Sequence, residues 1–216
     1  MNLNIVFDLD GTLITCENKQ KYVLHSILNK FDNIDAYSLN TWWKLKRNGY
    51  NTEKALIKIG ISNAEYIAKE WIRIIENSTW CSLDRPYEDS LSTLDYLKNV
   101  PEFKISILTA RKFVHQVYQV ITMFGFNALI DDLIVVKPEE GIQKKTHYLK
   151  RIEPLIYIGD SEVDHFASLN SKTRFVALTR GQRSRGFLKK VGVIQIENNL
   201  KFLRNDDFIS RLKKNQ

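Results

Sequence analysis

The segment from Leu3 to Leu13, LNIVFDLDGTL, constrains the fold of this chain more than any other. Its first residues are apolar and partly β-branched, which favours a buried strand, and Gly11 predicts a turn shortly after Asp8. Residues two apart in an extended chain point the same way, so Asp8 and Asp10 face the same space beyond the strand. Two carboxylates held together repel each other, and burial strengthens the repulsion, so a cation or a proton has to relieve them. This costly arrangement is typical of a functional site, although Asp-Gly pairs also occur in ordinary turns.

Length and cysteine content set broad limits on the class of protein. A chain of 216 residues can hold one large domain, or a core with a modest insertion. Asp8 interrupts the N-terminal apolar run, so we expect neither a signal peptide nor a membrane span. Cys16 and Cys81 are isolated and lack the spacing of metal ligands, which predicts a reducing, cytoplasmic location.

The formal charge of +7 is concentrated at the C-terminal end of the chain. Residues 180–216 contain 10 Lys and Arg against 3 Asp and Glu, whereas residues 1–179 contain 22 of each kind. Such a segment is most often a solvated surface, so we do not expect nucleic acid as a partner. A basic patch for RNA or for an acidic partner is the alternative.

Residues 15–84 predict a small unit made of helices, because apolar residues recur there at helical spacing and no strand pattern is convincing. The predicted helices are Lys19–Phe31, Leu39–Leu45, Thr52–Ile59 and Ser62–Ser78. We expect the tryptophans of this region to form its core rather than a ligand site.

After Pro86 the pattern changes to strands that alternate with helices. The predicted strands are Phe103–Thr109, Leu133–Lys137, Leu155–Asp160, Arg174–Thr179 and, as a sixth strand, Val193–Ile196; the predicted helices are Ser90–Val100, Arg111–Phe124, Thr146–Ile152 and Val163–Asn170. Because these strands are nearly continuous apolar runs, they predict an α/β fold with a Rossmann-like parallel sheet covered by helices on both faces.

Polar residues end several of these strands, and parallel strands bring their carboxyl ends to one edge of the sheet, where ligands bind. The residues concerned are Asp8, Thr109, Lys137, Asp160 and Thr179, and Asp164 follows Asp160 by four positions. Candidate ligands that are all oxygens favour Mg²⁺, and the absence of His and Cys among them argues against zinc.

Three short motifs resemble those of the haloacid dehalogenase-like phosphohydrolase superfamily. Residues 8–12 (DLDGT) resemble its first motif, residues 108–111 (LTAR) its second, and residues 159–161 (GDS) with Asp164 its fourth. The motifs occur in the family order, each at the end of a predicted strand, and the resemblance spans the whole chain. It implies a catalytic core formed by residues 1–14 and 85–216, with residues 15–84 similar to the family's C1 cap.

The resemblance and the chemistry of the residues together imply a role for each. Asp8 would be the nucleophile that forms an aspartyl-phosphate, and Asp10 would be the general acid and then the base that activates water. Mg²⁺ would be held by Asp8, the main-chain carbonyl of Asp10, Asp160, and Asp164 directly or through water. Thr109 and the Ala110 amide would hold the phosphoryl oxygens, and Thr12 and Arg47 are further candidates for substrate binding.

The lysine of the family's third motif is ambiguous in this sequence. Lys137, Lys144 and Lys145 compete, and Lys145 is favoured slightly because it opens a helix that leads into the strand before Asp160. Lys137, at 23 residues before Asp160, has a separation that also occurs in the family. Arg47 lies in a turn between predicted helices, where an exposed position is the alternative to substrate contact.

These observations predict a Mg²⁺-dependent phosphatase for a small phosphorylated metabolite or nucleotide, since a helical cap over the site favours a small substrate. The alternatives are a phosphomutase of the same superfamily, or a non-catalytic binding protein that uses the basic C-terminal region. We expect no membrane partner, and the protein to be a monomer or a dimer.

Overall fold

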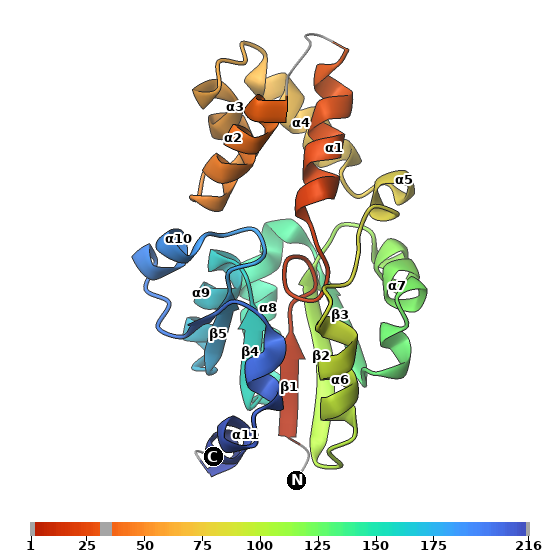
Figure 1. Ribbon diagram of the computed structural model, residues 1–216, viewed down its shortest axis with the longest axis vertical. Helices are drawn as coiled ribbons and strands as arrows, with labels where there is room; N and C mark the ends of the chain where they lie inside the picture. The colour runs from red at the N-terminus through yellow and green to blue at the C-terminus, as the bar shows by residue number, and fades with distance from the viewer. Residues whose placement is uncertain (1–2, 31–35, 215–216) are drawn as a thin grey trace.

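The computed structural model describes residues 3–30 and 36–214, and its centre is a six-stranded parallel sheet (Figure 1). The strands are β1 (Leu3–Phe7), β2 (Phe103–Ala110), β3 (Asp132–Val136), β4 (Ile156–Gly159), β5 (Phe175–Leu178) and β6 (Ile196–Glu197), in the order β3-β2-β1-β4-β5-β6. Ile5 of the central strand lies opposite Ile105 on one side and Ile156 on the other. The predicted parallel α/β sheet is confirmed, and β1 lies at its middle.

Alternate residues of β1 and β4 pack against helices on opposite faces of the sheet. Ile5, Phe7, Ile156 and Ile158 face a cluster that includes residues of three helices, whereas Val6 and Tyr157 face a cluster with residues of two others. The first group of helices is α6 (Ser90–Lys98), α7 (Val114–Met123) and α11 (Asp206–Lys214), and the second is α8 (Gly141–Ile152) and α9 (Glu162–Ser171). Burial on both faces explains why the strands are apolar without alternation.

A group of helices enters the chain between β1 and α6. These are α1 (Glu17–Leu28), α2 (Ala36–Arg47), α3 (Thr52–Lys58), α4 (Ala64–Ile74) and the short α5 (Ser78–Cys81). Figure 1 shows α1–α4, which we call the helical layer, beyond the carboxyl ends of the strands. The layer has its own hydrophobic cluster, with Trp42 fully buried within it and Trp71 partly buried against it.

Several element boundaries differ from the predicted ones. The single helix predicted for residues 62–78 is interrupted after α4, where the Glu76 carboxylate accepts hydrogen bonds from the backbone amides of Lys112 and Phe113. Helix α8 begins at Gly141 rather than Thr146, and the last strand is shifted to Ile196–Glu197. Helices α10 (Arg185–Lys190) and α11 were not predicted. Phe31, the predicted end of the first helix, lies outside the described residues.

None of the described helices combines the length and the apolar character that a membrane crossing needs.

Candidate active site

Three buried aspartates meet at the carboxyl edge of the sheet. Asp8 follows β1, Asp160 follows β4, and Asp164 lies in the first turn of α9. One carboxylate oxygen from each lies within 4.8 Å of the others. All three side chains are buried, and Asp160 is only 1% exposed. The structure thus brings together three of the four residues predicted to hold a metal.

Lys145 is the cation that faces this cluster. Its Nζ donates hydrogen bonds to Asp8 Oδ1 at 2.8 Å, to Asp164 Oδ1 at 2.6 Å and to the Tyr157 hydroxyl at 3.0 Å. Burial alone lowers the pKa of Lys145, but Asp164 and Asp8 outweigh this effect and raise it, so the side chain stays charged. Lys137 and Lys144, the competing candidates, are exposed.

Asp164 is held by a network of short contacts at the start of α9. The Asp164 amide donates to Ser161 Oγ at 3.4 Å and the Ser161 amide donates to Asp164 Oδ2 at 3.2 Å, which forms a capping box. Ser161 Oγ also donates to Asp164 Oδ2 at 2.7 Å. The Tyr157 hydroxyl donates to Oδ1 at 2.5 Å. Burial raises the pKa of Asp164, but Lys145 and these hydrogen bonds more than compensate and lower it. Asp164 is therefore an ionised residue that also positions Lys145.

Asp160 and Asp8 are less well compensated. Asp160 Oδ2 accepts a hydrogen bond from the Gln182 amide, whereas its buried Oδ1 has no partner among the residues that the structure describes. Burial, followed by the charges of Asp8 and Asp164, raises the pKa of Asp160. Burial also raises the pKa of Asp8 to about 7, partly opposed by Lys145. Three carboxylates therefore face one lysine, and a buried oxygen lacks a donor.

This donor set fits a hard divalent cation. The cluster contains only oxygen ligands, which suit Mg²⁺ better than zinc or copper. A cation would give the unpartnered Asp160 Oδ1 a ligand and would offset the negative charge that Lys145 leaves uncompensated.

The carboxylate of Asp10 belongs to a different network. Arg111 binds it with two hydrogen bonds, from Nε to Oδ2 at 2.7 Å and from Nη2 to Oδ1 at 2.5 Å. Lys19 Nζ lies 3.8 Å from Oδ1, and both cations also contact Asp84. Burial raises the pKa of Asp10, but Arg111 and Lys19 outweigh it and lower the pKa to about 2. The side chains of Asp8 and Asp10 are therefore compensated by different cations.

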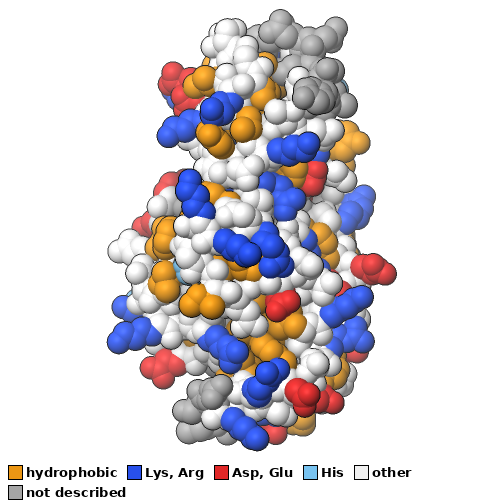
Figure 2. Space-filling model, turned by 60° about the vertical axis from the view of Figure 1, so that its left-hand side comes forward, with side chains coloured by type: hydrophobic (Ala, Val, Ile, Leu, Met, Phe, Trp, Pro, Cys, Tyr) orange, Lys and Arg blue, Asp and Glu red, His pale blue; other side chains and the backbone are white. Residues whose placement is uncertain are grey.

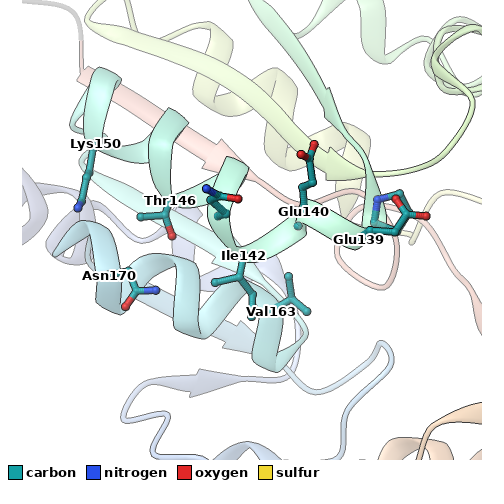
Figure 3. A pocket seen from close by; sticks show the side chains of 10 residues that line it. Glu139, Glu140, Ile142, Thr146, Lys150, Val163 and Asn170 are labelled. Carbon is teal, nitrogen blue, oxygen red and sulfur yellow. The ribbon is translucent and has the colours of Figure 1, made fainter.

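A cavity of about 460 Å³ adjoins Asp10 between the sheet edge and the helical layer. Asp10 and Ala110 line it from the sheet, and Lys19, Gln20 and Trp71 line it from the layer. A larger cavity, of about 660 Å³, lies beside α8 and α9 and includes Thr146 and Asn170 (Figure 3). None of the predicted site residues lines this second cavity. Of the predicted site residues, Asp10 and Ala110 line the cavity next to Asp10, whereas Asp8, Asp160 and Asp164 are not among its lining residues.

A family profile described as haloacid dehalogenase-like hydrolase matches residues 5–178. The chain belongs to this family. No curated protein matches the sequence of this chain significantly.

Solved structures of other proteins share the fold of this hydrolase. A predicted phosphatase from Clostridium acetobutylicum is 20% identical over 99% of both chains, with a TM-score of 0.70. A predicted phosphoglycolate phosphatase from Haemophilus somnus is 20% identical, over 100% of this chain and 98% of the other, with a TM-score of 0.66. Protein tyrosine kinase A from Mycobacterium tuberculosis is 16% identical, over 96% and 98% of the two chains, with a TM-score of 0.72. Identities this low establish the common fold alone.

The remaining predicted residues of the hydrolase lie in three different environments. Thr109 is buried at the end of β2, one residue before the cavity-lining Ala110. Thr12 is buried, and its Oγ1 has no hydrogen-bond partner among the described residues. The Arg47 guanidinium donates to the backbone carbonyl oxygens of Thr179 and Arg183 and does not line the cavity next to Asp10. Substrate binding by Arg47 stays a prediction without support from this arrangement.

Residues 180–184, which we call the 180–184 loop, connect the site to the helical layer. The Gln182 amide binds Asp160, the Arg183 guanidinium donates to the Lys46 carbonyl at 3.0 Å, and the Ser184 amide donates to the Arg47 carbonyl at 2.8 Å. A Cβ atom at Gly181 would overlap Asp160 Oδ2 and would come within 2.6 Å of Gly11 Cα. The loop can therefore approach Asp160 only because position 181 is glycine.

Tyr157, Arg111 and Gln182 contact site carboxylates but were not predicted to be functional. For Tyr157 a signal existed, because a hydroxyl-bearing residue interrupts the aliphatic run LIYIGD just before Asp160. The bidentate contact of Arg111 with Asp10 bridges 101 positions of the chain, so no local pattern reveals it. Gln182 contributes through its backbone amide, which no side-chain pattern reveals.

The basic C-terminal region is partly neutralised within the fold. Arg180, Arg183 and Lys213 form ion pairs with Asp89, Glu162 and Glu102. Figure 2 shows Lys and Arg side chains along the whole length of one face, with acidic and hydrophobic side chains between them. The expectation that nucleic acid is not a partner stays a prediction.

Proposed function

We propose that this hydrolase is a Mg²⁺-dependent phosphatase that transfers the phosphoryl group of a small phosphomonoester to Asp8 and then to water. The observation that carries the proposal is the buried cluster of Asp8, Asp160 and Asp164, in which a lysine is present but one carboxylate oxygen has no donor. Membership of the haloacid dehalogenase-like hydrolase family supports the reaction class.

Asp8, Asp160 and the main-chain carbonyl of Asp10 would hold the ion, with Asp164 directly or through water. When bound, Mg²⁺ neutralises carboxylate and phosphate charge that otherwise opposes attack on phosphorus. Asp8 attacks phosphorus, and Lys145, fixed by Asp164 and Tyr157, stabilises negative charge on the nucleophile and the phosphoryl oxygens. Thr109 and the Ala110 amide hold further phosphoryl oxygens.

Asp10 serves as the general acid for the leaving alcohol and as the base for the water that hydrolyses the phosphoenzyme. Arg111 holds both oxygens of Asp10 beside the cavity, which fixes the direction of the carboxylate. We further propose that residues 15–84 act as a cap over a catalytic core made of residues 1–14 and 85–216.

The test is hydrolysis of p-nitrophenyl phosphate with and without Mg²⁺. We expect turnover to stop in excess chelator and to return with Mg²⁺, and Asp160→Asn to raise the Mg²⁺ concentration required. Asp132→Asn, a change at an exposed position away from the cluster, is the matched control. Undiminished turnover in excess chelator would contradict the proposal.

A further inference from the structure

Four charged side chains form a closed network around Asp10. The Arg111 guanidinium donates to both oxygens of Asp10 and, through Nη2, to Asp84 Oδ2 at 2.9 Å. Lys19 Nζ lies 2.8 Å from both oxygens of Asp84 and 3.8 Å from Asp10 Oδ1. Two cations therefore share two carboxylates, and Asp84 contacts both of the cations that face Asp10.

Asp84 is the most deeply buried member of this network. Its side chain is 0% exposed, against 3% for Arg111, 5% for Lys19 and 17% for Asp10. Burial raises the pKa of Asp84, while Lys19 and Arg111 oppose this rise and favour the ionised form. Asp10 is the member with the most exposed surface, and it lines the cavity. Asp84 therefore has no surface for a substrate and can act only through its neighbours.

Asp84 restricts the guanidinium of Arg111. All three nitrogens of this group are engaged, because Nε and Nη2 donate to Asp10, Nη2 donates also to Asp84, and Nη1 donates to Cys81 Sγ at 3.7 Å. A side chain at a reacting centre keeps its direction only when the groups that hold it are themselves fixed. The direction of the Asp10 carboxylate thus depends on Asp84 as well as on Arg111.

The network also joins the two segments that connect the sheet to the helical layer. Lys19 lies in the first turn of α1, which follows the outgoing segment, and Asp84 lies on the returning segment between α5 and α6. The two segments run side by side, since the Thr15 amide donates to the Arg85 carbonyl at 2.7 Å (Figure 1). A purely structural role of Asp84, as a link between these segments, is the alternative that a test has to separate.

We propose that Asp84 is a positioning residue, which together with Lys19 and Arg111 holds the Asp10 carboxylate in the direction required of the base that activates water. The inference rests on the proposed function, because it concerns the second step of that same reaction. In that step Asp10 takes a proton from water, the water oxygen forms a bond to phosphorus, and the bond from phosphorus to the Asp8 oxygen breaks. With an activated ester the first step needs no base, so it should depend much less on Asp84.

The test measures the two steps separately with p-nitrophenyl phosphate in Mg²⁺. With enzyme in excess, stopped-flow absorbance gives the rate of p-nitrophenol release, and acid quenching gives the rate at which the trapped phosphoenzyme decays. We expect Asp84→Asn to slow phosphoenzyme decay by about tenfold, a part of the roughly 10²–10⁴ that a base contributes, and to change p-nitrophenol release by less than about twofold. Equal slowing of both steps would assign Asp84 a structural role and reject the inference, and so would slowing of neither step.

A double-mutant comparison tests whether Asp84 acts through Asp10. In Asp10→Asn the base is already lost, so adding Asp84→Asn should not slow phosphoenzyme decay further. Slowing by the same factor in both backgrounds would overturn the inference. If phosphoenzyme decay in Asp10→Asn is as fast as in the wild type, Asp10 is not the base, and the inference fails together with that part of the proposed function. If Asp10→Asn slows the decay and Asp84→Asn does not, the inference alone fails.

Asp131→Asn is the matched control. The Asp131 carboxylate pairs with Lys98 and accepts a hydrogen bond from the Ile105 amide, away from the network, so both rates should stay at their wild-type values. If thermal unfolding shows that Asp84→Asn does not fold, Asp84→Asn combined with Lys19→Gln takes its place, because the pair removes one charge of each sign. Arg111 again loses its second carboxylate, so the same selective slowing of phosphoenzyme decay is expected, and equal slowing of both steps again rejects the inference.

Discussion

Asp8 and Asp10 are two residues apart, yet their surroundings shift the pKa values of their carboxyl groups in opposite directions. Asp8 is buried with a single lysine contact, so burial raises its pKa to about 7. Asp10 is held by Arg111 and lies near Lys19, and these cations overcome burial and lower its pKa to about 2. In the metal-free protein a raised pKa works against Asp8 as a nucleophile, and a cation at the cluster would favour its ionised form. The low pKa of Asp10 suits the base that activates water better than the acid.

The two aspartates should therefore respond differently to substitution. Asp8→Asn removes the nucleophile, so it should give no product from p-nitrophenyl phosphate. Asp10→Asn keeps the nucleophile but removes the acid and base, which typically costs roughly 10²–10⁴ in rate. Because p-nitrophenol needs little protonation to leave, Asp10→Asn should release a burst near one equivalent of enzyme, followed by slow turnover. Stopped-flow absorbance measures the burst.

The control is the wild-type enzyme, in which both steps run and no isolated burst is expected. Equal bursts from both variants, or steady turnover by Asp8→Asn, would show that the nucleophile is a different residue.

Gly181 should be as sensitive as the carboxylates, although it has no side chain. In Gly181→Ala the new Cβ would overlap Asp160, and either Asp160 or the 180–184 loop has to move. A displacement of about 1 Å at a reacting centre costs on the order of 100-fold in rate, so we expect a loss of this size in kcat/KM. Steady-state kinetics with p-nitrophenyl phosphate measure it.

Gly186→Ala is the matched control, because its nearest neighbour, Ser184 Oγ, would lie at an ordinary 3.9 Å. We expect this variant to retain its activity. Equal losses in the two variants would mean that the loss in Gly181→Ala does not arise from the overlap with Asp160.

At the scale of elements, the C-terminal end of α2 contacts the 180–184 loop and carries a buried lysine, Lys46. Lys46 Nζ donates to Thr52 Oγ1 at 2.9 Å and lies 4.5 Å from the ring centroid of Trp71. Burial, with a smaller contribution from Arg183, lowers the pKa of Lys46 to about 7. In the unfolded chain the same lysine has its ordinary pKa of 10.5, so folding and proton release are linked.

This linkage predicts a pH dependence of stability. Between pH 7 and 10.5 the unfolded state binds a proton at Lys46 that the folded state has lost, so the free energy of unfolding rises with pH. The expected slope is about 1.4 kcal/mol per pH unit, and it should be absent below pH 7. Urea unfolding of the wild type and of Lys46→Met across this range measures the difference.

Lys58→Met is the matched control, since Lys58 is an exposed lysine of the same helical layer. The free energy of unfolding of Lys58→Met, plotted against pH, should run parallel to that of the wild type. A Lys46→Met curve that is also parallel to the wild type would show that Lys46 stays protonated in the folded protein.

The order of elements could be predicted because the strands are apolar runs buried on both faces and most helices have a regular apolar face. Long-range contacts could not be predicted in the same way. The sequence left three lysines open, and only the phase of α8, which places Lys145 on the same buried face as Tyr148 and Leu149, directs one of them at Asp8. The contact of Arg111 with Asp10 depends on β2 being the neighbour of β1 in the sheet. The contact of Gln182 with Asp160 depends on the path that the 180–184 loop takes past the end of β4.

At the scale of the whole molecule, the chain forms separate hydrophobic clusters. One joins the sheet to α6, α7 and α11, and another lies within the helical layer. The layer contacts the rest through polar groups, such as the hydrogen bonds from Ser184 and Arg183 to α2, and through the Phe187 ring, which packs against Gly49. A polar contact of this kind can open without loss of either hydrophobic cluster, which suits a cavity that has to admit substrate.

The position of the helical layer within the chain also affects how the sheet forms. Ile5 has to find Ile105, and the cost of closing that loop grows with its length. If residues 17–81 fold first around their own cluster, roughly a third of the loop remains flexible, and closure becomes easier by about 1 kcal/mol. A layer that folds first would therefore lower the entropic cost of pairing the central strand. Cavity-forming changes at Trp42 or Leu24, residues that are buried in the layer, should then slow the refolding of the sheet.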